Sequence, residues 1–92
     1  MSPAAHPLRV LVVEDHHDTA TILGVLLGLW GHESRICHTG AEALAAARDF
    51  VPHVVLLDIG LIGGMDGYDV ARRLRQQEAL RGAVVIAVTG YG

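Results

Sequence analysis

The sequence predicts an α/β fold in which helices cover a parallel β-sheet, and three observations favour this class. Short apolar runs alternate with longer segments of helical character along the 92 residues. Three of the four strand-like runs are almost entirely apolar, which is typical of parallel strands buried on both faces. Hydrophobic residues make up 51% of the chain, enough for the core of one small domain. We therefore expect an N-terminal tail over residues 1–7 and one domain over residues 8–92.

The first three predicted elements are a strand, a helix and a second strand. Leu8–Val13 is a compact apolar run rich in β-branched residues, which favours a buried strand. The apolar segment that follows predicts a helix that begins at a cap on Asp18 or Thr19 and closes near Trp30. Glu33–Cys37 alternates polar and apolar residues, which predicts a strand from a weaker pattern.

The middle of the chain predicts a second helix and a third strand. Thr39 and Glu42 have the spacing of a capping box, in which each side chain satisfies an unpaired N–H at the helix start. The alanine-rich segment behind them predicts a helix that runs to about Asp49. Val54–Leu57 is a continuous apolar run, and it predicts a buried strand.

A third helix and a fourth strand follow a glycine-rich loop. Asp66 is placed to cap a helix that runs from Tyr68 to about Gln76. Ala83–Val88 is a further apolar run, which predicts the last strand.

Composition excludes several classes of function. The chain has 7 basic and 10 acidic residues and a net charge of -3, so we expect no direct binding of nucleic acid or anionic lipid. We expect no membrane span, because every apolar run is shorter than the roughly 20 residues that a spanning helix needs. Cys37 is the single cysteine, which fits a cytoplasmic protein without an intrachain disulfide.

Polar residues follow three of the predicted strands directly. Glu14 and Asp15 follow the first strand, Asp58 ends the third, and Thr89 follows the fourth. Right-handed crossovers place the C-terminal ends of parallel strands at one edge of the sheet, where open α/β sheets bind ligands. The sequence therefore predicts three carboxylates and a hydroxyl at one rim.

A rim of this kind suits magnesium and phosphate chemistry. Crowded carboxylates repel one another, and Mg²⁺ relieves that repulsion because it prefers oxygen ligands. A bound cation also neutralises charge when a phosphoryl group arrives. The Asp58 carboxylate is a nucleophile that needs no base at pH 7. Thr89 and the main-chain N–H groups of Ile59 and Gly90 are candidates to bind phosphate oxygens.

Four segments resemble the receiver domain of two-component response regulators: Leu11-Val12-Val13-Glu14-Asp15, Val54-Val55-Leu56-Leu57-Asp58-Ile59, Met65-Asp66-Gly67-Tyr68 and Val88-Thr89-Gly90-Tyr91. The resemblance covers residues 8–92. It implies a flavodoxin-like, doubly wound sheet with strand order 2-1-3-4, so that the first and third strands are neighbours. It also implies a signalling module rather than an enzyme.

The resemblance also implies a role for each rim residue. Asp58 would accept a phosphoryl group from the phosphohistidine of a sensor kinase or phosphotransfer protein. Asp15 and Asp58 would bind Mg²⁺ directly, Glu14 would bind it through water, and Gly60 would offer its carbonyl. Thr89 would be the hydroxyl that moves toward the phosphoryl group.

The resemblance stops short of the whole family pattern. The family continues through a helix, a fifth strand and a last helix, and the fifth strand ends in a lysine that contacts the phosphate. This chain contains no lysine. One charge-assisted contact is worth about 1.5–3 kcal/mol, so we expect phosphotransfer to be about ten- to a hundred-fold slower. Without a fifth strand, Ala83–Val88 is an apolar edge that favours a homo-oligomer or a swapped assembly.

Alternative functions follow from the same residues. A truncated receiver that cannot be phosphorylated would act as a protein-interaction or dimerisation module. A haloacid-dehalogenase-type phosphatase needs a second Asp where Gly60 stands, and a dinucleotide-binding enzyme needs glycines where the chain has the acidic pair. A transition-metal site at His16 and His17 is a minor alternative. The cluster of arginines at positions 72, 73 and 75 is interpreted as a solvated helix face.

Overall fold

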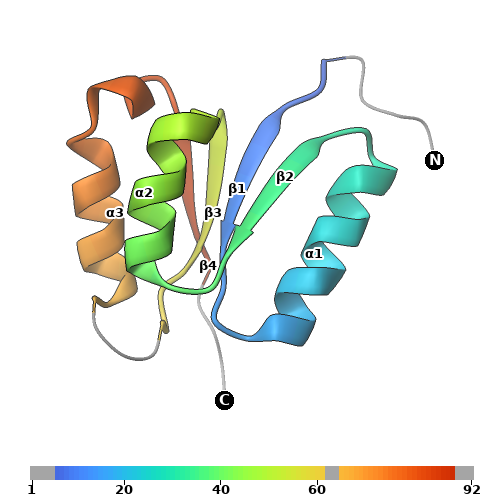
Figure 1. Ribbon diagram of the computed structural model, residues 1–92, viewed down its shortest axis with the longest axis horizontal. Coiled ribbons are helices and arrows are strands. Elements are labelled where there is room, and N and C mark those ends of the chain that lie inside the picture. The colour runs from blue at the N-terminus through green and yellow to red at the C-terminus, as the bar shows by residue number, and fades with distance from the viewer. Residues whose placement is uncertain (1–5, 62–64, 89–92) are drawn as a thin grey trace.

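A computed structural model describes residues 6–61 and 65–88 of the chain. Its sheet has four parallel strands in the order β2-β1-β3-β4, which confirms the predicted topology (Figure 1). The strands are β1 (Arg9–Val13), β2 (Glu33–Cys37), β3 (Val54–Asp58) and β4 (Val84–Val88).

Helices lie on both faces of the sheet. Helix α1 packs on one face against β1 and β2, and α2 and α3 cover the opposite face (Figure 1). The helices are α1 (His17–Leu29), α2 (Gly40–Phe50) and α3 (Gly67–Arg75), and a short 3-10 turn that the sequence did not predict follows them at Glu78–Leu80. None of the helices in the described residues is long and apolar enough to cross a membrane.

Two of the three predicted helix caps are confirmed. The Thr39 hydroxyl accepts a hydrogen bond from the N–H of Glu42 at 3.1 Å, and the Glu42 carboxylate accepts one from the N–H of His38 at 3.0 Å. The Asp66 carboxylate accepts a hydrogen bond from the N–H of Asp69 at 2.9 Å. Both helices therefore begin where the capping residues predict.

The predicted start of α1 is wrong. The helix begins at His17, and its N-cap is His16, whose side chain makes no capping bond. The cause is the preceding acidic pair, because the Glu14 carboxylate accepts a hydrogen bond from the N–H of His16 at 3.0 Å. This bond turns the chain into the helix before it reaches the predicted caps at Asp18 and Thr19.

The main core lies between the sheet and the two helices α2 and α3. Alternate residues of β1 and β3 point into it, as the two-residue period of a strand requires. The core includes Leu11, Val13, Cys37, Ala43, Ala47, Phe50, Val55, Leu57, Val70 and Leu74, all of them buried. This packing fixes the ends of β1 and β3 relative to each other.

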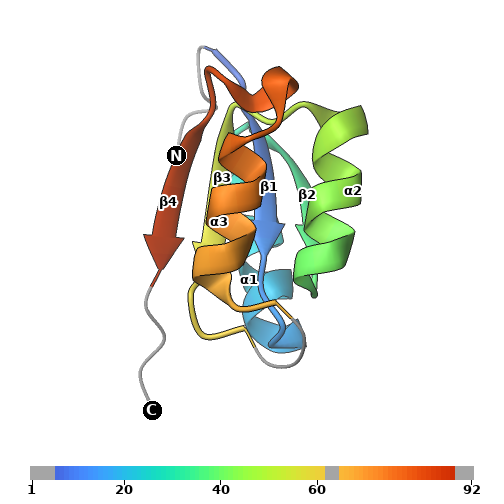
Figure 2. The ribbon, with the colours of Figure 1, turned by 90° about the vertical axis from the view of Figure 1, so that its left-hand side faces the viewer.

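Strand β4 is the least covered part of the sheet. Its neighbour is β3 on one side, and Figure 2 shows it standing beyond the helices at the edge of the fold. Val84, Ile86 and Val88 are 57%, 45% and 48% exposed. Among residues 6–61 and 65–88, these apolar side chains of β4 are therefore not covered by another element.

Candidate metal centre

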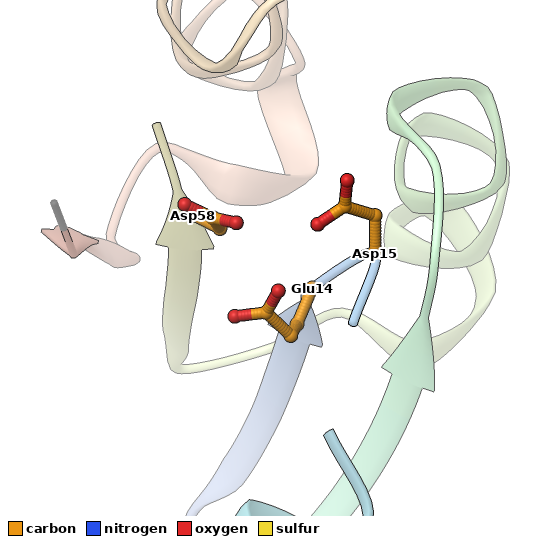
Figure 3. Close-up of side chains that lie close together, drawn as sticks. All are labelled: Glu14, Asp15 and Asp58. Carbon is orange, nitrogen blue, oxygen red and sulfur yellow. The ribbon is translucent and has the colours of Figure 1, made fainter. Parts of the chain in front are cut away.

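The acidic rim lies at the ends of two neighbouring strands. Val13 of β1 is in register with Leu57 of β3, so the residues that follow them emerge side by side. Figure 3 shows Glu14 and Asp15 beyond the end of β1 and Asp58 at the end of β3, with their carboxylates turned toward a common space. One oxygen of each carboxylate lies within 4.8 Å of the others. The structure thus brings together the three acids that the sequence predicted.

The three carboxylates of this cluster carry like charges at short range. Burial raises the pKa of the Glu14 carboxyl above its ordinary value, and the nearby charge of Asp58 raises it further. The hydrogen bond from the N–H of His16 acts in the opposite direction. A divalent cation would offset this repulsion, and a donor set made only of carboxylate oxygens suits a hard ion such as Mg²⁺.

Histidines surround the cluster without joining it. The Nδ1 atom of His38 lies 3.0 Å from the main-chain oxygen of Glu14, as a donor to that carbonyl, and the His17 ring stacks on the His38 ring at 3.8 Å. Within residues 6–61 and 65–88, the group of side chains that can hold a metal consists of the three carboxylates. It includes neither His16 nor His17, so the alternative transition-metal site gains no support.

The main chain around Asp58 is held by two hydrogen bonds. The Oδ1 atom of Asp58 accepts a hydrogen bond from the N–H of Gly60 at 2.9 Å. The N–H of Ile59 donates to the carbonyl of Val88 at 3.0 Å. This second bond corrects the expectation that the Ile59 N–H is free to bind phosphate, because the ladder between β3 and β4 continues one residue past Asp58.

The other predicted site residues are less closely defined. Gly60 is exposed next to the cluster, in the loop that leaves β3. Thr89 and Gly90, predicted to bind phosphate, lie outside the described residues.

Gly67 is a site residue that the sequence reasoning missed. A β-carbon at this position would lie 2.4 Å from the α-carbon of Ile59 and 2.8 Å from the carbonyl oxygen of Asp58. Only glycine therefore lets the first turn of α3 pack against the loop that carries Asp58. One signal in the sequence could have identified this residue. Gly67 follows the capping Asp66 directly, at the first position of a helix, where no turn requires a glycine.

An apolar cleft opens beside the acidic cluster, between α1 and the strands β3 and β4. Its volume is about 160 Å³. Its walls are largely apolar, and Glu14 and Asp58 lie at its edge; the other lining residues are Val12, Val13, Thr19, Leu23, Leu56 and Val88. The acidic cluster thus borders the half of the sheet that α1 does not cover.

Comparison with known proteins points to one family. The family model described as the response regulator receiver domain matches residues 10–92. The DNA-binding response regulator MtrA of Mycolicibacterium smegmatis is 36% identical over 81 residues, which are 88% of this chain and 35% of that protein. The polar-differentiation response regulator DivK of Brucella anthropi is 34% identical over 85 residues, which are 92% of this chain and 68% of that protein.

Solved structures give the same result. The N-terminal domain of a response regulator receiver protein from Methanoculleus marisnigri superposes with a TM-score of 0.84 at 28% identity, over 91% of this chain and 68% of that one. NtrX from Brucella abortus gives a TM-score of 0.86 at 32% identity, over 95% of this chain and 20% of that one. The chain spans about a third of the length of the MtrA proteins and about two thirds of DivK.

Proposed function

The chain belongs to the response regulator receiver domain family of two-component signalling, and from this premise we propose that Asp58 is its phosphoacceptor. The observation that carries the proposal is the convergence of Glu14, Asp15 and Asp58 within 4.8 Å at the ends of β1 and β3. Family membership rests on sequence similarity, and the cluster rests on the geometry of the fold.

The proposed reaction is transfer of a phosphoryl group to Asp58. A carboxylate oxygen of Asp58 attacks phosphorus, the P–N bond of a phosphohistidine breaks, and the released imidazole takes up a proton from solvent. The product is an aspartyl phosphate. The hydrogen bond from the N–H of Gly60 to Oδ1 of Asp58 supports this role, because it orients the carboxylate before transfer.

We assign the metal to the same cluster. Asp15 and Asp58 would bind Mg²⁺ directly, Glu14 would bind it through water, and Gly60 would contribute its carbonyl. When bound, Mg²⁺ supplies positive charge that neutralises the incoming phosphoryl oxygens. Thr89 and the N–H of Gly90 complete the proposed phosphate contacts. The N–H of Ile59 is left out of this set, because it is bonded to Val88.

Intact-mass spectrometry after incubation with Mg²⁺ and acetyl phosphate tests the proposal. We expect one phosphoryl adduct on the wild-type chain and none on Asp58→Asn. Asp49→Asn is the matched control, because this exposed aspartate on α2 is absent from the cluster. An equal adduct on Asp58→Asn would contradict the proposal. A wild-type chain that carries no adduct, although circular dichroism shows it to be folded, would also contradict it.

The partner is proposed from the chemistry of the transfer. A sensor histidine kinase or a phosphotransfer protein supplies the phosphohistidine, and the exchange takes place in the cytoplasm. Residues 8–92 form the receiver domain in this proposal, and residues 1–7 precede it as a tail. MtrA is named as a DNA-binding protein, but this chain matches only 35% of it, and we propose no direct nucleic-acid contact here.

A second candidate function is a binding module that associates with itself through β4 and does not cycle phosphate. The observation that favours it is the exposure of Val84, Ile86 and Val88 on a strand without charged residues. The mass measurement separates the two functions, since a module of this kind gives no adduct although it is folded.

A further inference from the structure

His38 stands where three elements meet beside the acidic cluster. It lies between β2 and α2, and its main-chain N–H donates to the Glu42 carboxylate at 3.0 Å. Its Nδ1 atom lies 3.0 Å from the Glu14 carbonyl oxygen, and because that oxygen only accepts, Nδ1 is the donor. Its ring stacks on the ring of His17, the first residue of α1. His38 therefore connects the end of β1 with the starts of α1 and α2.

The His38 side chain takes the place of a main-chain donor of the sheet. β1 and β2 are in register up to the pair Val13 and Cys37, and the N–H of Glu14 donates to the Cys37 carbonyl at 2.9 Å. In a parallel ladder, the next hydrogen bond would join the N–H of Thr39 to the Glu14 carbonyl. Thr39 is instead the N-cap of α2, where the chain leaves the sheet. The Nδ1 atom of His38 supplies the donor to the Glu14 carbonyl at this point.

A hydrogen bond to the Glu14 carbonyl fixes the peptide that leads into Asp15. The peptide unit is planar, so a restraint on this oxygen also restrains the amide nitrogen of Asp15. The Glu14 carboxylate is held separately, because it accepts a hydrogen bond from the N–H of His16 at 3.0 Å. Figure 3 shows the two acids in succession beyond the end of β1. The main chain that carries both is thus restrained without a cation.

The His17 ring restrains the ring of His38. The two centroids lie 3.8 Å apart, and the planes differ by 11°. A stacked neighbour limits rotation of the His38 ring, so its Nδ1 atom stays directed at the carbonyl. The stack and the hydrogen bond are separable by substitution. Phenylalanine at position 38 keeps a ring without a donor, and asparagine keeps a donor without a ring.

We propose that His38 is a positioning residue for the metal centre. By donating from Nδ1 to the Glu14 carbonyl, it holds Glu14 and Asp15 in the arrangement that binds the cation. It is not itself a ligand, because the group that can hold a metal within residues 6–61 and 65–88 consists of the three carboxylates. The inference rests on the proposed function, which assigns Mg²⁺ to these carboxylates. Partners that orient metal ligands in this way commonly contribute about 10–100-fold to metal affinity.

Electron paramagnetic resonance of free Mn²⁺ measures cation binding without a phosphodonor. Mn²⁺ suits the same oxygen ligands as Mg²⁺, and competition with Mg²⁺ identifies the shared site. We expect the Kd for Mn²⁺ to rise at least about 10-fold in His38→Phe. In His38→Asn we expect it to stay within about three-fold of wild type, because the amide nitrogen of asparagine is as many bonds from the β-carbon as Nδ1 of histidine.

His53→Phe is the matched control. His53 also bonds to the main chain of β1 through Nδ1, where it accepts from the N–H of Arg9 at 2.9 Å, but it does so at the opposite end of the strand. Its substitution should leave the Kd for Mn²⁺ within about two-fold of wild type. Circular dichroism establishes that each variant is folded. His38→Ala removes both ring and donor, should match His38→Phe, and replaces it if the larger ring prevents folding.

The outcomes separate this inference from the proposed function. Equal Mn²⁺ affinity in wild type and in the donor-free variants of His38 would overturn the positioning role and leave the metal site in place. A Kd for His38→Asn as high as that of His38→Phe would also overturn it, because the ring and not the donor would then matter. A folded wild-type chain that binds no Mn²⁺ would overturn the metal assignment and the inference together.

Discussion

Gly67 packs directly against the main chain at Asp58: a β-carbon on Gly67 would lie 2.8 Å from the Asp58 carbonyl oxygen. The loop that carries the candidate phosphoacceptor thus rests on the first turn of α3. We expect Gly67→Ala to lower the free energy of unfolding by about 1–3 kcal/mol, since backbone atoms must move apart. Urea denaturation measures this change. Gly82→Ala is the matched control, because its new methyl group has no neighbouring atom within 4 Å. An equal loss of unfolding free energy in the two variants would contradict the account.

Repulsion within the acidic cluster should cost stability when no metal is bound. Burial and the charge of Asp58 raise the pKa of Glu14, so its ionised form is disfavoured in the folded state. The metal-free chain should therefore gain stability as the pH falls through this raised pKa. We expect Glu14→Gln to stabilise the metal-free chain at neutral pH by a few tenths to about 1 kcal/mol. Thermal unfolding in EDTA measures the difference.

Magnesium should reverse the order of stability of the wild-type chain and Glu14→Gln. Binding to the folded state stabilises it according to the ratio of free ion to Kd, and Glu14→Gln weakens that binding. At millimolar Mg²⁺ the wild-type melting temperature should rise more than that of the variant. Equal shifts for both would show that Glu14 takes no part in binding the ion.

Val51 follows α2 with a left-handed backbone, at a φ of 47°. The Arg9 guanidinium supports this turn through hydrogen bonds of 2.9–3.0 Å to the Val51 carbonyl. Glycine adopts this conformation without strain and alanine does not, so we expect Val51→Gly to be more stable than Val51→Ala by about 1 kcal/mol. In the interior of α2, alanine is favoured over glycine, so Ala45→Gly should be less stable than wild type. Denaturation of all three variants settles the comparison.

The cap of α2 predicts a pH dependence at the acidic end. The N–H of His38 donates to the Glu42 carboxylate and lowers the pKa of Glu42 below its ordinary value of 4.5. Because the pKa of Glu42 is lowered in the folded state, the ionised carboxylate stabilises the fold above pH 4.5. This stabilisation is lost as the pH falls through the pKa that Glu42 has in the folded state. Wild type should therefore melt higher than Glu42→Gln at pH 6, and the two melting temperatures should converge as the pH falls below the lowered pKa. Glu33→Gln, at the exposed sheet edge, is the matched control for the loss of a carboxylate.

Much of the fold was predictable from local patterns. Apolar runs identified three of the four strands, and an alternating pattern identified β2. Thr39 and Asp66 marked the starts of α2 and α3, because capping depends on residues within one turn. The meeting of Glu14 with Asp58 followed from topology, since parallel strands end at one edge. These features depend on short-range chemistry or on general rules of chain connection.

The details that the sequence did not reveal depend on contacts between distant residues. Ile59 is unavailable to phosphate because the β4 ladder reaches Val88. The start of α1 is the local exception, because the N–H of His16 donates to the Glu14 carboxylate only two residues before it. The close approach of Gly67 to the Asp58 loop is also tertiary. No pattern of period two or 3.6 encodes contacts of this kind.

The central claim is that Asp58 accepts a phosphoryl group in an acidic, magnesium-dependent site. Borohydride reduction after phosphorylation converts an aspartyl phosphate to homoserine, and tandem mass spectrometry of the peptides locates that residue. The account predicts homoserine at position 58 alone, formed with Mg²⁺ and absent when EDTA is added before the phosphodonor. Homoserine at Asp15, Asp18 or another aspartate, or label at position 58 that is indifferent to EDTA, would contradict it.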